Sequence, residues 1–293
     1  MSIHLHSTLE RMGILSPIIT NIRSKNNIHL YRIATNGRYF VLKVFDKLDD
    51  SREISNYKLL SGLGVSTLPM LKCTERALLL PDIAKSAVWR LGNEGDLSNP
   101  SIARNLAKWY KSLHEKGRKL DFTGFYDWTD VITIENIDRV AENTGTDANP
   151  LWHELRVRFA ELRRKISVIP RTLVFNDFYW TNFVVARDGS AAMMFDFNLM
   201  GQGYAYNDVR NVTVSLSDNA PQMFLDEYGV ENIGPFEVVA DSILEPLHRL
   251  LQPKWIDAAR AEFEAFNNGI EGTVLFENLR KWLNMSDLIF PSA

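Results

Sequence analysis

Three side chains in one stretch of the sequence have the chemistry and the order that phosphoryl transfer needs. Asn182 lies five positions after Asp177, and Asp196 lies 196 − 177 = 19 positions after it. Phosphoryl transfer requires oxygen ligands for a nucleotide-bound Mg²⁺ and a group that orients the acceptor hydroxyl. Asp177 can serve as this base, Asn182 can bind Mg²⁺ through its carboxamide oxygen, and Asp196 can bridge Mg²⁺ to the phosphates. A set of oxygen donors favours magnesium over zinc.

The spacing of these residues is that of a kinase catalytic loop. The interval from Asp177 to Asn182 matches the Asp-x-x-x-x-Asn interval of such loops, and Asp196 stands in an Asp-Phe-x setting on the next apolar strand. Each signal alone is weak, because an aspartate before a strand is usually a cap or turn residue. Their joint order is what indicates a catalytic site.

A lysine and a glutamate earlier in the chain add a cation and its partner. Lys43 stands among apolar residues in the segment 40–45, and Glu53 shares a predicted helix face with Tyr57 and Leu60. Because a half-buried ammonium without a partner is costly, we expect Lys43 and Glu53 to form an ion pair. The pair would direct the ammonium to the α- and β-phosphates.

The elements expected around these residues are an antiparallel N-terminal sheet and a mainly helical remainder. Alternating apolar residues and turn signals at 25–27 and 36–37 predict the sheet, the second turn being an Asn-Gly hairpin. The predicted strands are 18–23, 29–34, 39–45, 66–70, 77–80, 173–175, 183–185 and 193–195. Periodicity predicts helices at 51–60, 100–116, 151–166, 255–266 and 274–282, and the polar segment 120–149 reads as a connection with one short helix.

Composition places the chain among soluble globular proteins. It has 293 residues, enough for two lobes, with 45% hydrophobic and 24% charged residues. Its one cysteine, Cys73, excludes an intrachain disulfide and fits a reducing compartment. A net charge of −3 gives no reason to expect a nucleic-acid polymer as partner. Because no segment approaches the ~20 apolar residues that span a membrane, we expect a cytoplasmic protein. Nothing in the sequence specifies an oligomeric state.

The charge is uneven along the chain. From Asp218 onward there are 13 acidic and 5 basic residues, a difference of 13 − 5 = 8 negative charges. Two interpretations remain open. The acidic part can steer a cationic substrate, or it can be a solvated helical surface.

Together these features resemble the aminoglycoside phosphotransferase and choline kinase superfamily, the small-molecule branch of the protein-kinase-like fold. The resemblance covers nearly the whole chain, with 77–83 where the hinge should lie and 203–208 in family order. It implies an α+β, bilobal fold with a small N-terminal antiparallel β-sheet lobe carrying one helix and a larger, mainly helical C-terminal lobe. Residues 1–83 would form the nucleotide-binding lobe, and 84–293 the catalytic and substrate-binding lobe.

The resemblance also implies roles for single residues. Asp177 corresponds to the catalytic aspartate, Asn182 and Asp196 to the metal ligands, and Lys43 to the phosphate anchor. Backbone groups near Leu80, Asp82 and Ile83 correspond to the adenine contacts. Ser24 and the amides near it would approach the phosphates.

The chain departs from the family pattern at the catalytic loop. Phe175 and Asn176 stand where the family usually has His-Gly, so an aromatic that can only pack replaces a supporting histidine. Tyr204 and Ala205 stand where an Asp-Pro pair is usual, although Asp208 remains as an expected acceptor for loop amides. The loop around 24–27 has no glycine, which argues against a protein kinase more than against a small-molecule kinase.

The leading hypothesis is a small-molecule kinase that uses Mg²⁺ and ATP. It would transfer the γ-phosphate to a hydroxyl of a small, possibly cationic acceptor resembling an aminoglycoside, choline or a sugar. The alternative, motivated by Phe175, Asn176 and Tyr204, is a catalytically impaired nucleotide-binding pseudokinase or scaffold. A protein kinase is disfavoured because only a short turn at 201–203 precedes Asp208. Trp180 can line the acceptor pocket or pack against the C-terminal lobe.

Overall fold

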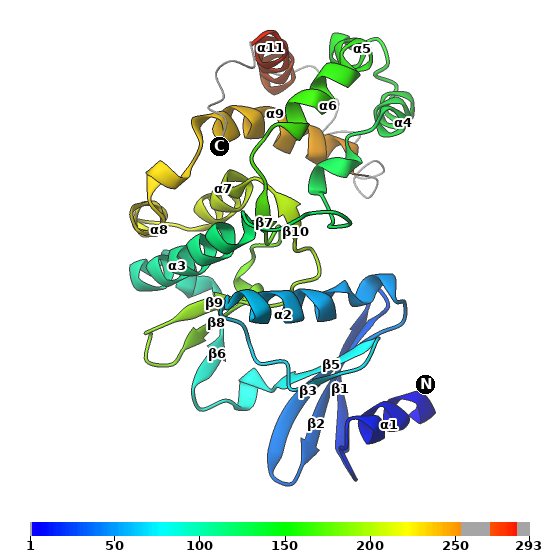
Figure 1. Ribbon diagram of the computed structural model, residues 1–293, viewed down its shortest axis with the longest axis vertical. Coiled ribbons are helices and arrows are strands. Elements are labelled where there is room, and N and C mark those ends of the chain that lie inside the picture. The colour runs from blue at the N-terminus through cyan, green and yellow to red at the C-terminus, as the bar shows by residue number, and fades with distance from the viewer. Residues whose placement is uncertain (1, 253–269, 286–293) are drawn as a thin grey trace. The chain divides into compact units, whose positions relative to one another are not determined.

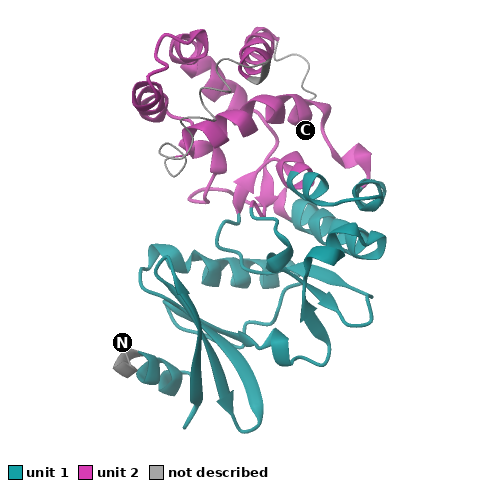
Figure 2. Cartoon of the chain, turned by 180° about the vertical axis from the view of Figure 1, so that it is seen from behind, with its two compact units in different colours: residues 1–116, 177–200, 211–228 teal, residues 117–176, 201–210, 229–293 magenta. Residues whose placement is uncertain are grey.

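A computed structural model of the protein describes residues 2–252 and 270–285 and has the predicted α+β class of fold (Figure 1). The chain divides into two compact units, residues 1–116, 177–200 and 211–228 in the first and 117–176, 201–210 and 229–293 in the second (Figure 2). The first unit contains all residues proposed above for the catalytic site. The predicted boundary at Ile83 falls inside it, and the helix predicted at 255–266 lies outside the described residues.

The first unit is built on a five-stranded antiparallel sheet in the order β1-β2-β3-β5-β4. Its strands are β1 (Ile18–Lys25), β2 (Ile28–Thr35), β3 (Arg38–Phe45), β4 (Lys72–Cys73) and β5 (Ala77–Pro81). Both predicted turns are tight because their central residues adopt positive φ angles, 52° and 62° at 26–27 and 48° and 69° at 36–37. This is the backbone of a type I′ hairpin turn.

Alternation along β3 separates the two faces of this sheet. Leu42 belongs to an apolar cluster that includes Leu9 of α1 (Ser2–Arg11), a helix that the sequence did not predict. The next residue, Lys43, therefore lies on the opposite face, where it meets Glu53 of α2 (Arg52–Leu63). The predicted helix at 51–60 is confirmed and continues to Leu63.

The strand predicted at 66–70 is wrong. This segment is irregular, and β4 forms two residues later, at Lys72–Cys73. Pro69 has no amide hydrogen to donate to a ladder. The carbonyl oxygen of Ser66 instead accepts a hydrogen bond of 2.7 Å from Nε1 of Trp109.

A second sheet of the first unit has the order β6-β8-β9. Its strands are β6 (Trp89–Leu91), β8 (Phe183–Ala186) and β9 (Ala192–Met194), and both pairings are antiparallel. The predictions of strands at 183–185 and 193–195 are confirmed to within a residue or two. Trp89 and Arg90, which follow the predicted hinge, belong to β6. The remaining elements of this unit include η2 (Ile83–Lys85), η3 (Glu94–Ser98), α3 (Pro100–Gly117) and α8 (Ala220–Tyr228). The last residue of α3, Gly117, is assigned to the second unit.

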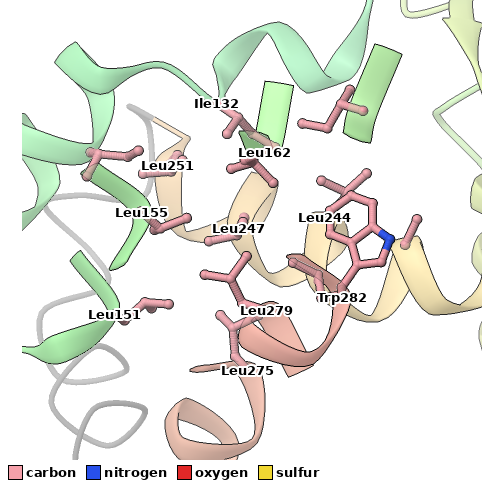
Figure 3. Packing of buried hydrophobic residues seen from close by; sticks show 14 of the residues in the cluster. Ile132, Leu151, Leu155, Leu162, Leu244, Leu247, Leu251, Leu275, Leu279 and Trp282 are labelled. Carbon is pink, nitrogen blue, oxygen red and sulfur yellow. The ribbon is translucent and has the colours of Figure 1, made fainter. Parts of the chain in front are cut away.

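The second unit is mainly helical and contains the two-stranded ladder of β7 (Thr172–Val174) and β10 (Gly201–Gly203). Its helices include η4 (Trp128–Val131), α4 (Ile134–Thr144), α5 (Pro150–Val157), α6 (Phe159–Ser167), α9 (Pro235–Leu251) and α11 (Ile270–Asn284). Helix α7 (Ala205–Ser215) begins in this unit. Buried side chains of α5, α6, α9 and α11 pack together in its core (Figure 3).

One helix prediction in this unit needs correction, and another is confirmed. The helix predicted at 151–166 is two helices, because the backbone at Arg158 leaves the helical region with φ −106° and ψ 19°. The connection at 120–149 contains one α-helix, as predicted, the 11-residue α4, which the hydroxyl of Thr133 caps by accepting from the amide of Asn136. Most residues of α4 are polar, and this composition concealed its buried face. Within the described residues, no helix combines the length and apolarity needed to cross a bilayer.

Candidate active site

The β8-β9 hairpin brings the two predicted metal ligands to the same end of one ladder. Phe183 pairs with Met194, and one step further the amide of Phe195 donates a hydrogen bond of 2.9 Å to the carbonyl oxygen of Asn182. Asn182 therefore makes this backbone contact itself, and Asp196 directly follows its partner Phe195. The short 3₁₀ turn η5 (Trp180–Asn182) precedes β8.

The side chain of Asn182 is oriented by Asp177. Its Nδ2 donates to the backbone oxygen of Asp177 at 3.0 Å and to the carboxylate Oδ2 at 2.9 Å. The amide nitrogen is committed to Asp177, and the carboxamide oxygen accepts from the hydroxyl of Thr181 at 3.3 Å. This oxygen has a second lone pair and is the atom of the side chain that can bind a cation. The structure thus joins the proposed base and one proposed metal ligand directly.

Asp196 has a backbone conformation that few residues adopt. Its φ angle is 65°, in the left-handed region that asparagine and aspartate tolerate better than most residues. Its Oδ1 accepts from Nζ of Lys43 at 2.8 Å and from Nδ2 of Asn198 at 2.6 Å. Both donors use Oδ1, so Oδ2 is the oxygen that can bind a metal ion. Sequence analysis assigned no role to Asn198.

Lys43 and Glu53 form the predicted ion pair in a dry environment. Nζ of Lys43 lies 2.5 Å from Oε2 of Glu53, and their side chains are 7% and 1% exposed. Burial lowers the pKa of Lys43, but the carboxylates of Glu53 and Asp196 raise it by more, so the ammonium stays charged. Burial raises the pKa of Glu53 to about 7, although the positive charge of Lys43 opposes this rise.

Phe197 connects this cluster to two helices. Its ring contacts the ring of Tyr57 edge to face at a centroid distance of 4.8 Å and stacks against Trp109 at 6.3 Å. Its carbonyl oxygen accepts from Nδ2 of Asn56 at 2.8 Å. Since Asn56 and Tyr57 belong to the same helix as Glu53, these contacts fix Asp196 and Glu53 to a common support.

The predicted adenine-contacting segment lies on the same face of the large sheet as Lys43. Leu80 pairs with Val41, two residues before Lys43 on β3, so their side chains share a face. The carboxylate of Asp82 caps Ala84 and forms a 2.5 Å ion pair with Arg32. Asp82 therefore has a structural role here, and adenine contact by the backbone of 80–83 stays a prediction.

Ser24 is not brought together with the other predicted site residues. It pairs with His29 and His29 pairs with Val44, which places all three on the face opposite to Lys43. Its hydroxyl interacts with Nδ1 of His29 at 3.0 Å. Its neighbour Arg23 pairs with Leu30, the register partner of Lys43, and so lies on the Lys43 face.

The start of the catalytic loop is supported within the second unit by Asp208. Its two carboxylate oxygens accept from the amides of Phe175 and Asn176 at 2.7 and 2.9 Å. This confirms the expected role of Asp208. Phe175 is fully buried, as expected for a residue that can only pack, and Asn176 adopts a φ angle of 65°, a glycine-like conformation that asparagine tolerates.

Two further expectations concern the loop aromatics and the acidic C-terminal part. Trp180 forms a tilted ring pair with the exposed Tyr179 at 5.5 Å, and the two residues follow the proposed base by two and three positions in the sequence. Among the acidic residues, Glu237 and Asp241 are buried and hydrogen-bonded to the amide of Tyr206 and to Arg210. These two carboxylates are structural and do not contribute to an acidic surface.

The donor set of the site fits Mg²⁺. Asp196 offers a carboxylate oxygen and Asn182 a carboxamide oxygen, which are hard ligands of the kind magnesium prefers. In the described part of the chain, no group of three or more His, Cys, Asp or Glu side chains forms a metal-binding cluster. A site with two protein ligands is typical of magnesium that is bound largely through phosphates and water.

With this geometry in view, comparison with known proteins identifies the family. The profile of the phosphotransferase enzyme family matches residues 19–239. The chain belongs to this family. A search of curated protein sequences finds no match.

Solved structures of phosphotransferases share the fold. Choline kinase LicA from Streptococcus pneumoniae aligns at 13% identity and a TM-score of 0.61, covering 97% of this chain and 99% of that chain. The gentamicin complex of APH(2")-IIa aligns at 14% identity and 0.61, covering 97% and 96%. Spectinomycin phosphotransferase APH(9)-Ia, in complex with ADP and spectinomycin, aligns at 12% identity and 0.53, covering 90% and 88%. The phosphotransferase therefore has the protein-kinase-like fold.

Proposed function

We propose that this phosphotransferase moves the γ-phosphate of ATP to a hydroxyl group of a small molecule. The observation that carries the proposal is the contact set of the first unit, in which Lys43 meets Glu53 and Asp196 while Asn182 meets Asp177. Family membership and a structural neighbour solved with ADP support it. Residues 1–83 would bind the nucleotide, 84–293 would supply catalysis and acceptor binding, and the protein would act in the cytoplasm.

Each side chain has a defined task in the proposed reaction. Lys43, held by Glu53, would bind the α- and β-phosphates, and Asn182 and Asp196 would hold Mg²⁺, which would neutralise charge on the phosphates. Asp177 accepts the proton of the acceptor hydroxyl while that oxygen forms its bond to the γ-phosphorus. The bond from the γ-phosphorus to the bridging oxygen breaks, and ADP leaves.

The acceptor is proposed to be a small hydroxylated molecule, possibly cationic, like an aminoglycoside, choline or a sugar. Structural neighbours include a choline kinase and two phosphotransferases solved with gentamicin and with spectinomycin, which supports an acceptor of the choline or aminoglycoside kind. The aromatic pair of Tyr179 and Trp180 offers ring faces on which a sugar or an ammonium group can rest.

A nucleotide-binding scaffold without catalysis is the second candidate, because Phe175 and Asn176 replace the usual loop residues. The contacts of these residues speak against it. Both amides remain bound to Asp208, and the proposed base and metal ligands keep mutually supportive hydrogen bonds.

A screen of ADP release over hydroxylated cations and sugars, in the presence of Mg²⁺, tests the proposal. With any accepted substrate, Asp177→Ala should lower kcat by about 10²- to 10⁴-fold, the usual contribution of a positioned base. Asp188→Ala removes the same charge from the exposed turn of the β8-β9 hairpin and should leave turnover unchanged.

Full turnover by the Asp177→Ala variant would disprove the mechanism. Tight binding of ATP and Mg²⁺ by calorimetry, without turnover of any acceptor in a broad panel, would instead favour the scaffold.

A further inference from the structure

A chain of polar side chains runs from the catalytic loop to helix α9 in the second unit. Oδ1 of Asn176 accepts from Nδ2 of Asn207 at 2.9 Å, and Oδ1 of Asn207 accepts from Arg210 at 2.7 Å. Nε of Arg210 lies 2.7 Å from Oδ2 of Asp241, whose Oδ1 accepts from the hydroxyl of Tyr204 at 2.9 Å. We refer to these five residues as the polar relay.

Burial makes the polar relay costly to interrupt. Asn207 and Asp241 are each 4% exposed, and Tyr204 is fully buried. A buried donor or acceptor that loses its partner retains its full desolvation penalty. Each member of the relay therefore depends on its neighbours for its orientation.

Asn207 has the geometry of a bridge. It lies on α7 beside Asp208, so one short segment supplies both groups that hold Asn176. Asp208 accepts from the backbone amide of Asn176, while Asn207 donates to the side chain of Asn176. Arg210, one helical turn after Asn207, then connects this segment to Asp241 of α9.

The residue held in this way is the last one before the proposed base. Asn176 has a φ angle of 65°, and the direction in which the chain enters the loop depends on that angle. A backbone in a sparsely populated conformation persists only when its surroundings fix it. The amide of Asn176 is fixed by Asp208, and its carboxamide is fixed by Asn207.

We propose that Asn207 is a positioning residue for phosphoryl transfer, acting through the side chain of Asn176 on the backbone that carries Asp177. The proposal rests on the proposed function. The relay takes over the loop support that the side chain of Phe175, which has no polar atoms, cannot give, and it anchors that support in α9. Nucleotide binding should not depend on it, since Lys43 and Asp196 have their own partners.

A double-mutant cycle tests the proposal. Asn207→Ala removes the donor, and Asn176→Gly removes the acceptor while keeping a residue that adopts a positive φ angle freely. Each single variant should lower kcat by roughly tenfold, the scale of a small misplacement of a catalytic group, with the nucleotide KM changed less than about twofold. The double variant should be no worse than either single variant, because both remove the same contact.

Two more variants separate the contacts of Asn207. Asn207→Asp keeps an oxygen for Arg210 but loses the donor to Asn176, so it should resemble Asn207→Ala. Asn219→Ala makes the same chemical change at an exposed position after α7 and should behave like the unsubstituted protein.

A readout without turnover keeps the test independent of the acceptor. Hydrogen-deuterium exchange of residues 175–182 should become faster in Asn207→Ala and in Asn176→Gly but not in Asn219→Ala, with unchanged far-ultraviolet circular dichroism. Unchanged exchange in the first two variants, or kcat losses that multiply in the double variant, would overturn the positioning role. Absence of turnover in the unsubstituted protein would overturn the proposed function alone, and the exchange data would still decide the role of Asn207.

Discussion

The ionisation of Glu53 is strongly altered by its place in the site. Burial raises its pKa from the ordinary value of 4.5 to about 7, while Lys43 opposes the rise. Between these two values the folded protein retains a proton that the unfolded chain has released. The contribution of Glu53 to stability is therefore complete below about pH 4.5 and decreases as the pH rises toward 7.

Substitution of Glu53 should remove this pH dependence. We expect the free energy of unfolding to fall less steeply in Glu53→Gln than in the unsubstituted protein between about pH 4.5 and 7. Urea denaturation at several pH values in this range measures both slopes. Glu75→Gln makes the same change on an exposed residue and should keep the slope of the unsubstituted protein. Equal slopes in the Glu53 and Glu75 variants would contradict the burial argument.

At the scale of elements, the two faces of β1 separate residues that are adjacent in sequence. Arg23 shares a face with Lys43, whereas Ser24 lies on the face of His29 and Val44. The hairpin that follows has no glycine with which its amides could closely approach phosphates. A side-chain cation on the Lys43 face is the group that can replace such amides.

Arg23→Ala should therefore weaken the binding of ATP by roughly fivefold, the effect expected of a solvent-exposed ion pair. The affinity for adenosine, which has no phosphates, should stay the same. Isothermal titration calorimetry with both ligands measures the difference, and Ser24→Ala serves as the control from the opposite face. Equal ATP affinities for Arg23→Ala and the unsubstituted protein would refute the assignment.

The candidate site residues differ in how well the sequence predicted their positions. Spacing alone led to the groups that meet in the first unit, Lys43 with Glu53 and Asp196, and Asp177 with Asn182. Ser24 was placed by analogy with a loop, but the register of β1 shifts between Asn21 and Arg23, and such an irregularity changes which residues face the site. The alternation of apolar and polar residues in the sequence does not predict this register shift.

Contacts between residues that are far apart in the sequence could not be predicted from local sequence patterns. Asn207 meets Asn176 across 31 positions of sequence, and nothing near either residue indicates the contact. The wrong strand prediction at 66–70 has a local cause. The prediction relied on the apolar residues of this segment and gave too little weight to Pro69, which has no amide hydrogen for a strand ladder. Local pattern thus predicted which candidate site residues meet better than it predicted the residues and elements that support them.

At the scale of the whole molecule, the chain has separate cores that stabilise different parts of it. One lies between α1 and the large sheet, and the other joins the helices of the second unit. Leu279 of α11 is fully buried. Figure 3 shows it among the side chains of the second core. Val274 lies on the same helix and is 45% exposed.

Leu279→Ala should lower the free energy of unfolding by about 2 to 5 kcal/mol, the range for a buried leucine whose cavity does not fully collapse. Val274→Ala should change it by no more than about 0.5 kcal/mol. Urea denaturation followed by tryptophan fluorescence measures both values. Similar losses in the two variants would show that α11 does not pack in this core as described.

The single backbone contact between Phe195 and Asn182 has a consequence for variants and related proteins in which the turn between β8 and β9 has a different length. It lies at the open end of the β8-β9 ladder, beside the two proposed metal-ligand positions, while the turn at 187–190 closes the other end. Residues added to that turn lengthen the interval in the sequence and leave the neighbours in space unchanged. The turn is therefore the place to insert a reporter group, and a search for distant homologues should allow this interval to vary while holding the residues on either side of the ladder constant.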